Sequence, residues 1–172
     1  MSGVDRPGKA AIREARPEDA AAAIALWTEA YVTHGVGGRT QPYDVEDFQE
    51  SRRNGAVFVV DADAGLAGVV ALGPPGAAGN VVAAPQEAEL SRLAVAIPAR
   101  GRGIGRALTV HCEQRARAAG WPAIALWSRP AQIEAHRLYE SLGYRRVPER
   151  DSVDAGGQNR LVFRLELQRQ RG

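Results

Sequence analysis

The sequence predicts a mixed α/β domain in which helices flank a central sheet. Short apolar runs bounded by glycine, proline and aspartate predict strands, whereas apolar residues at helical spacing predict helices. These segments follow one another in the order β-α-α-β-β-β-α-β-α-β-β, without an internal repeat. A length of 172 residues fits one domain better than two. We expect this domain at residues 10–167, after a disordered leader at 1–9 and before a basic tail at 168–172.

The first half of the chain is expected to form one strand, two helices and a hairpin. Pro17 suits the first turn of a helix, and Gly35 can end that helix. The sequence Ala-Asp-Ala-Gly at 62–65 is typical of a hairpin turn. The expected elements are a strand at 10–15, a helix from Pro17 to Gly35, a more polar helix at 43–53, and strands at 56–61 and 66–72.

The second half alternates strands and helices. Glycine, proline and alanine dominate residues 73–86, so we expect a loop there. Gly120 and Gly143 each follow a segment of helical apolar spacing and are expected to end those helices. The expected elements are a strand at 89–95, a helix at 103–119, a strand at 123–127, a helix at 131–142, and strands at 144–147 and 158–167.

Composition excludes several classes of function. The formal net charge is only +2, from 22 basic and 20 acidic residues, which does not argue for a nucleic acid partner. No long uncharged apolar run and no secretory signal pattern occur, so we expect no membrane partner and a cytoplasmic location. His34, His111 and His136 are not spaced as metal ligands, and no metal is expected.

The most informative stretch is a glycine-rich turn, Arg-Gly-Arg-Gly-Ile-Gly-Arg at 100–106, between a predicted strand and a predicted helix. Glycines without side chains let successive backbone N–H groups converge on one anion, and the helix N-terminus adds its positive dipole end. Arginines crowd the same region. Their guanidinium groups suit a phosphate ligand, but an arginine-biased composition that solvates helices explains them equally well.

Two standard nucleotide-binding patterns fail at this turn. A Walker loop ends in Gly-Lys-Ser/Thr, whereas here Gly105 is followed by Arg106 and Ala107. The dinucleotide fingerprint requires a third glycine where this chain has Arg106. The pattern that remains is Arg-x-x-Gly-x-Gly.

In context, the segment from residue 89 to residue 144 resembles the GNAT superfamily of acyl-CoA-dependent N-acetyltransferases. The resemblance has three linked parts: the strand Glu-Leu-x-x-Leu-x-Val at 89–95, the turn Arg-x-x-Gly-x-Gly at 100–105 with its helix, and Ala-x-x-Leu-Tyr-Glu-x-Leu-Gly-Tyr at 135–144. It covers about a third of the chain. It implies a GNAT-like fold with a mixed, mostly antiparallel sheet of six to seven strands, splayed between the fourth and fifth, and about four helices.

The resemblance also implies acetyl-CoA as cofactor. Its pantetheine arm would lie in the splayed gap against the main chain of Leu93, Ala94 and Val95. Gln132 stands where relatives often carry an asparagine that contacts this arm. The cofactor pyrophosphate would bind the glycine-rich turn, for which the candidates are Arg100, Gly101, Arg102, Gly103, Ile104, Gly105 and Arg106.

Two residues match catalytic positions of the family. Tyr139 corresponds to a tyrosine that protonates the departing thiolate, although it also lies on the apolar stripe of its helix and suits the core. Glu89 corresponds to a glutamate that receives the proton of the amine. The alternative for Glu89 is an edge carboxylate paired with an arginine such as Arg92. The implied mechanism is direct attack of the amine on the thioester in a ternary complex.

The resemblance leaves the acceptor open. A small molecule, an amino acid, an antibiotic or a peptide amine all suit a primary-amine acceptor, and a homodimer is common in the family. The alternatives are an acyl-CoA-binding sensor of the same fold without turnover, and a domain that binds another nucleotide. Residues that could border the acceptor are Trp27, Tyr31, His34, Trp127 and Ser128.

Overall fold

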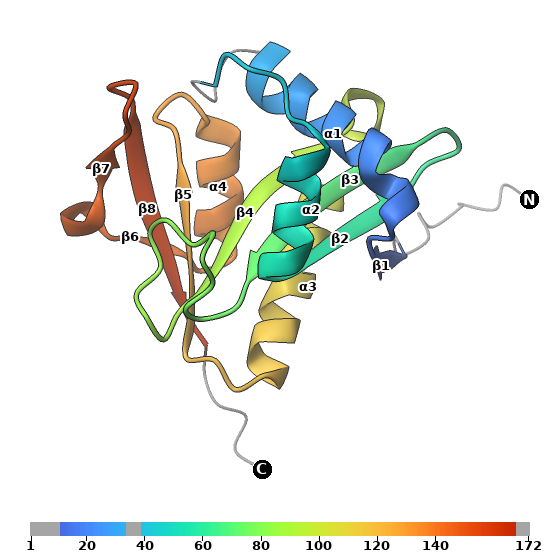
Figure 1. Cartoon of the computed structure of the whole chain (residues 1–172). Helices are drawn as coiled ribbons and strands as arrows, with labels where there is room; N and C mark the ends of the chain where they lie inside the picture. Colours follow the sequence, from blue (N-terminus) through green and yellow to red (C-terminus); the bar gives the residue numbers. More distant parts are fainter. Residues whose placement is uncertain (1–10, 34–38, 168–172) are drawn as a thin grey trace, which may run out of the picture.

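The computed structural model describes residues 11–33 and 39–167, which form one mixed sheet between two helical layers (Figure 1). The leader at 1–9, the tail at 168–172, His34 and Gly35 lie outside the described residues. The strands are β1 (Ile12–Glu14), β2 (Ala56–Asp61), β3 (Leu66–Gly73), β4 (Ala88–Val95), β5 (Ala123–Ser128), β6 (Arg145–Arg146), β7 (Ser152–Val153) and β8 (Asn159–Glu166). The α-helices are α1 (Ala20–Thr28), α2 (Val45–Asn54), α3 (Ile104–Ala118) and α4 (Ile133–Ser141).

The helices cover opposite faces of the sheet. Helices α1 and α2 lie on one face, where Trp27 and Phe48 pack on apolar side chains of β2 and β3. Helices α3 and α4 lie on the other face, where Leu108 and Tyr139 contribute to a second apolar core. Gly68 of β3 lets α3 approach closely, because a Cβ there would lie 2.8 Å from a methyl carbon of Ile104. Both faces are therefore buried, which accounts for the nearly continuous apolar runs of β2 and β3.

The sheet opens between β4 and β5. The strand order is β1-β2-β3-β4-β5-β8-β6, with β7 paired to β8. Strands β4 and β5 run parallel and pair only at Ala88–Ile124 and Glu89–Ala125, whereas the other pairings are antiparallel. The predicted splay is therefore confirmed, and beyond Glu89 the main chain of β4 has no pairing with β5.

A bulge distorts β4 beside this opening. Ser91 pairs with Ala71 and Ala94 with Val69, so two residues of β4 face a single residue of β3. Arg92, inside the bulge, has a φ of 53°, a left-handed value that is uncommon for a side chain as large as arginine. Such backbone strain persists only where surrounding contacts hold it.

Several element boundaries differ from the sequence prediction, and three of the differences have a physical reason in the structure. The sheet has eight strands rather than six to seven, because the short β7 carries too few residues for a periodic pattern. The helix expected from Pro17 begins as a 3₁₀ turn (Pro17–Asp19), continues as α1 and ends as a π-helical turn (Glu29–Thr33). Helix α2 begins at Val45 because the Asp44 carboxylate caps it by accepting a hydrogen bond from the Asp47 amide.

No helix in the described part of the chain is both long enough and apolar enough to cross a membrane.

Candidate functional site

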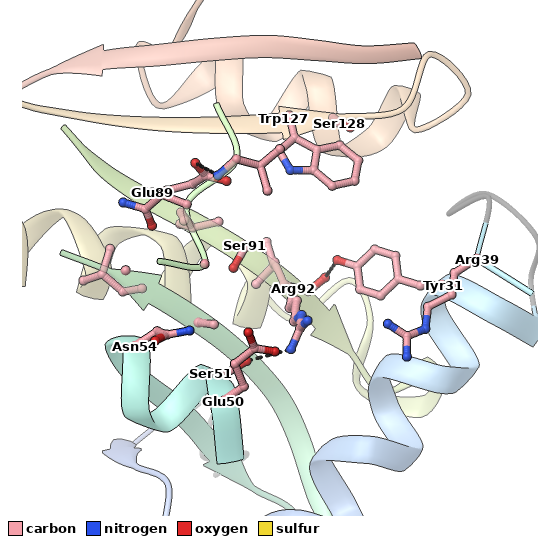
Figure 2. Close-up of a pocket in the computed structure, with 18 of the residues that line it drawn as sticks. Tyr31, Arg39, Glu50, Ser51, Asn54, Glu89, Ser91, Arg92, Trp127 and Ser128 are labelled. Atoms are coloured by element: carbon pink, nitrogen blue, oxygen red, sulfur yellow. Dashed lines mark hydrogen bonds between the residues drawn. The ribbon is translucent and has the colours of Figure 1, made fainter. Parts of the chain in front are cut away.

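A pocket of about 400 Å³ lies where β4 and β5 separate (Figure 2). Its walls come from β3, β4, β5, α2, α4, the π-helical turn and the loop that precedes β4. It brings together seven of the residues that the sequence proposed: Tyr31, Glu89, Leu93, Trp127, Ser128, Gln132 and Tyr139.

Glu89 has one carboxylate oxygen anchored and one unbonded. Its Oε2 accepts hydrogen bonds from the backbone amides of Val81, Val82 and Ala83, at 2.8, 2.8 and 2.9 Å. Within residues 11–33 and 39–167, Oε1 accepts no hydrogen bond. Burial raises the pKa of Glu89 above its ordinary value, and the three amides only partly oppose this. The side chain therefore combines a fixed position with increased basicity.

Tyr139 belongs both to the core and to the pocket. Its ring packs against Tyr144 and Phe163, with ring centroids 5.7 and 6.0 Å away. The residue also lines the pocket, and its hydroxyl donates to no other described residue. Burial raises the pKa of Tyr139 well above its ordinary value, so the phenol keeps its proton at neutral pH. Tyr139 can therefore be part of the core and still be available as a proton donor.

The glycine-rich turn lies beyond the pocket, at the C-terminal end of β4. Gly101 and Gly103 have φ values of 77° and 78°, and a Cβ at either position would meet nothing within 4 Å. Gly103 is the N-cap of α3 and contributes no side-chain cap, so the first amides of the helix lack an intrahelical acceptor. Open space beside unpaired amides fits a pyrophosphate group.

The three arginines of the turn have different surroundings. Arg100 donates from Nε to the Val95 carbonyl at 3.3 Å, and Arg106 donates from Nη2 to Ser141 Oγ at 2.6 Å. Arg102 is exposed and has no hydrogen bond or ion pair with the residues that the structure describes. Arg102 is thus the guanidinium of this turn that is most available to an anionic ligand.

Other predicted residues have clear structural partners. Trp27 is fully buried and does not line the pocket, and its indole nitrogen donates to the Arg92 carbonyl at 2.8 Å, which supports the bulge. The Tyr31 hydroxyl donates to the carbonyl of Leu93, which lies on β4 next to Arg92. Gln132 Oε1 accepts from Ser128 Oγ and from the Arg129 amide, so this side chain closes the turn between β5 and α4. Its amide nitrogen is left for other contacts.

Sequence reasoning missed several residues of the pocket wall. Arg92 does not pair with Glu89 but contacts Asp47 and Ser51 on α2. Arg39 and Arg129 also line the pocket. Arg92 and Arg129 have partners far away in the chain, whereas Arg39 is held by nearby residues of its own loop and by Asp47, and no motif marks any of the three. The loop amides that hold Glu89 come from a segment expected only to be irregular.

Comparisons with known proteins agree with this geometry. Residues 10–144 match the model of the acetyltransferase (GNAT) family. N-acetylaspartate synthetase from Rattus norvegicus is 28% identical over 137 residues, which make up 77% of this chain and 44% of that protein. The chain spans less than half the length of the curated relatives it matches.

Solved structures share the fold at low identity. An N-acetyltransferase from Staphylococcus aureus Mu50 has a TM-score of 0.76 at 20% identity, covering 92% of this chain and 99% of that chain. A GNAT superfamily phosphinothricin acetyltransferase from Sinorhizobium meliloti, solved in complex with AcCoA, has a TM-score of 0.74 at 18% identity over 95% of each chain.

Proposed function

The chain belongs to the acetyltransferase (GNAT) family, and on that premise we propose that it transfers an acetyl group from acetyl-CoA to a primary amine. One observation carries the proposal. An anchored carboxylate and a protonated phenol, Glu89 and Tyr139, line the same pocket, and strand β4 runs from this pocket toward the glycine-rich turn with its unpaired amides. The name of the curated relatives and the AcCoA complex of a similar structure support the same reaction.

The glycine-rich turn would hold the pyrophosphate of acetyl-CoA. The unpaired amides of the turn and the positive end of α3 favour an anion, and Arg102 adds a charge. Backbone N–H groups of Leu93 to Val95 on the open edge of β4 would bind the arm and polarise the carbonyl. When bound, acetyl-CoA supplies the thioester that the amine of the acceptor attacks directly.

Glu89 would accept the proton of the acceptor amine at Oε1. An alkylamine has a pKa of about 10.4, so roughly one molecule in 10³ is free base at pH 7, a handicap of ~4–5 kcal/mol. A positioned base recovers part of this, since general base catalysis typically contributes ~10²–10⁴-fold. The raised pKa of Glu89 increases its capacity to take this proton, and the anchoring amides keep the carboxylate in place.

Tyr139 would supply the second proton. Its Oη keeps a proton at neutral pH and can donate it to the leaving sulfur. A thiol has a pKa of about 8.5, so its departure as thiolate requires only modest help. We therefore assign the larger catalytic contribution to Glu89 and the smaller to Tyr139.

Free-thiol release tests the proposal. The purified chain is incubated with acetyl-CoA and a panel of amines, and the thiol released is compared with that from acetyl-CoA alone. We expect amine-dependent release that the Glu89→Gln variant loses. Binding of CoA in calorimetry without thiol release on any amine would instead support a sensor module, and failure to bind CoA would refute the proposal.

A further inference from the structure

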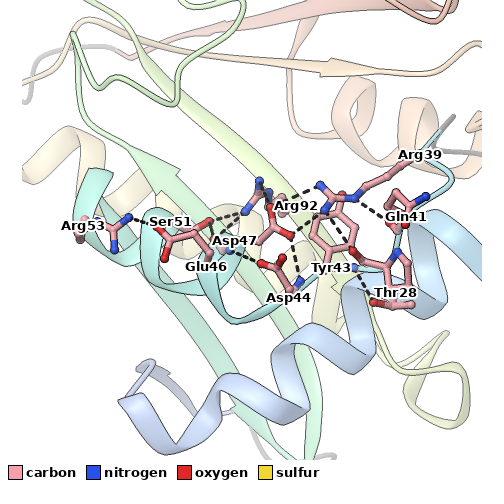
Figure 3. Close-up of polar contacts among 11 residues, drawn as sticks. Thr28, Arg39, Gln41, Tyr43, Asp44, Glu46, Asp47, Ser51, Arg53 and Arg92 are labelled. Carbon is pink, nitrogen blue, oxygen red and sulfur yellow. Dashed lines mark hydrogen bonds and ion pairs between the residues drawn. The ribbon is translucent and has the colours of Figure 1, made fainter.

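The pocket contains three arginines, and their pairing differs. Arg129 is buried and donates from Nη2 to Asp154 Oδ2 at 2.6 Å, so one carboxylate balances one guanidinium. Within the described part of the chain, Arg39 and Arg92 do not each have a carboxylate of their own. Both lie against the single carboxylate of Asp47, at the N-terminal end of α2 (Figure 3).

The sharing of Asp47 is unequal. Arg39 binds it in a fork, with Nη2–Oδ2 at 2.7 Å and Nη1–Oδ1 at 3.4 Å. Arg92 Nη2 lies 3.7 Å from Oδ1, which makes an ion pair but not a hydrogen bond. In these ion pairs, one carboxylate thus faces two guanidinium groups.

Arg92 also keeps donors available. Its Nη1 donates to the Asp47 carbonyl at 2.9 Å and to Ser51 Oγ at 2.7 Å. Among the described residues, neither Nε nor Nη2 of Arg92 has a hydrogen-bond acceptor. Because Nε and Nη2 lie on one edge of the planar guanidinium, they can bind both oxygens of one carboxylate.

The guanidinium of Arg92 is held in place before any ligand arrives. It stacks over the rings of Trp27 and Tyr43, 5.3 Å from each centroid, and Arg39 stacks on the same Tyr43 at 4.0 Å. The left-handed backbone of Arg92 and the hydrogen bond to its carbonyl from Trp27 fix the start of the side chain. A preorganised cation loses less entropy when it binds an anion.

The same pocket presents the opposite charge elsewhere. Glu89 lines it from the first half of β4, whereas Arg92 lies at the bulge and points toward α2 (Figure 2). Glu50 also lines the pocket, but it is exposed, so solvent screens its charge. A molecule with an amine at one end and a carboxylate at the other matches this arrangement. A polyamine, with no anion, would leave the Arg92 donors unmet.

We propose that the acceptor is a small amino acid whose carboxylate binds the Arg39–Arg92 pair while its amine lies toward Glu89. This inference rests on the proposed acetyl transfer and adds a substrate class to it. It separates free amino acids from peptide N-termini, because a peptide has an uncharged amide where the amino acid has its carboxylate.

The test compares L-amino acids with their carboxamides as acceptors. Each amide keeps the amine and side chain but loses the carboxylate. Because the amine of the amide is less basic, more of it is free base at neutral pH. Faster reaction of the free amino acid therefore cannot be explained by a larger fraction of free base. Initial rates of thiol release give kcat/KM for both members of each pair. An alanine tripeptide amide and spermidine complete the panel. The variants are Arg92→Met, Arg92→Lys, Arg39→Met and the control Arg53→Met, which removes an exposed arginine paired with Glu46 on the outer side of α2.

Loss of a charged hydrogen-bond pair costs ~10–100-fold, so we expect the best amino acid to exceed its amide by ~10-fold or more. In Arg92→Met the ratio should fall to about 2-fold, with a smaller fall in Arg39→Met and none in Arg53→Met. Arg92→Lys should restore only part of the preference for the acid over the amide, because an ammonium group cannot bind a carboxylate in the two-pronged way of a guanidinium. Activity on the amide shows that each variant is folded.

Two results would overturn the inference while the proposed function stands: thiol release that is as fast with amides, the tripeptide or spermidine as with free amino acids, or an acid preference that survives in both Arg92→Met and Arg39→Met. No thiol release with any amine would instead remove the proposed function, and the inference with it.

Discussion

The placement of the pyrophosphate can be tested with a pair of glycine substitutions on one helix. Gly103 precedes the first residue of α3 and Gly120 follows its last turn. Both have left-handed φ values, 78° and 77°, and a Cβ at either would meet nothing within 4 Å. With a rise of ~1.5 Å per residue, about 22 Å of helix separates them. Gly120→Glu is therefore a matched control for Gly103→Glu.

The structure predicts opposite rankings for stability and binding. A side chain in the left-handed region costs ~1–2 kcal/mol at either position. In Gly103→Glu the added carboxylate lies at the positive end of α3, which stabilises the protein by ~0.3–1 kcal/mol. In Gly120→Glu it lies at the negative end, which destabilises the protein by a similar amount. Gly120→Glu should therefore be the less stable of the two, with melting temperature lowered by roughly 2–4 °C per kcal/mol.

Binding should follow the other order. Each charge-assisted hydrogen bond to the pyrophosphate is worth ~1.5–3 kcal/mol. Loss of two of them in Gly103→Glu costs about 3–6 kcal/mol, or ~10²–10⁴-fold in the Kd for CoA. Calorimetric titration with CoA and thermal unfolding give the two quantities separately. If Gly103→Glu binds CoA as tightly as Gly120→Glu does, the pyrophosphate is not on this turn and the reasoning fails.

Three further predictions concern carboxylates and a phenol. Glu89→Gln keeps an acceptor for the anchoring amides, so CoA binding should persist while kcat falls by ~10²–10⁴-fold in steady-state assays. Tyr139→Phe should lower kcat by ~10²-fold or less, and the wild-type rate at saturating acceptor should show no decline attributable to Tyr139 below pH ~10, because burial raises the pKa of that phenol. Burial alone would raise the pKa of Glu87, but hydrogen bonds from Arg150, the Ala84 amide and Arg164 outweigh it and lower the pKa from 4.5 to about 2. Because the folded-state pKa is depressed, this stabilisation is present above pH 4.5 and lost as the pH falls toward 2. Urea unfolding should show Glu87→Gln to be less stable than wild type by at most about 3 kcal/mol at pH 7, and a difference that does not shrink at acid pH would contradict the assignment.

Local features of the site could be predicted from sequence because they depend on near neighbours in the chain. The turn at 100–105 is recognisable since glycine is required where φ is positive, at Gly101 and Gly103, and since α3 begins directly afterwards. The apolar runs of β2 and β3 predicted those strands almost to the residue. The break of the first helix into three helical types was not predictable, because its apolar spacing is nearly the same in each.

The sequence by itself therefore determined the order of the elements other than β7, the family pattern and the glycine-rich turn before α3. Tertiary structure alone decided the surroundings of the proposed catalytic and binding residues. Glu89 is held by amides of a loop without any motif, and Arg92 reaches Asp47, 45 residues earlier in the chain, across the gap between β4 and α2. Charge balance in a pocket depends on which side chains meet in space. Packing of sheet against helix, rather than spacing along the chain, brings Arg92 of β4 to the carboxylate that the nearby Arg39 already contacts.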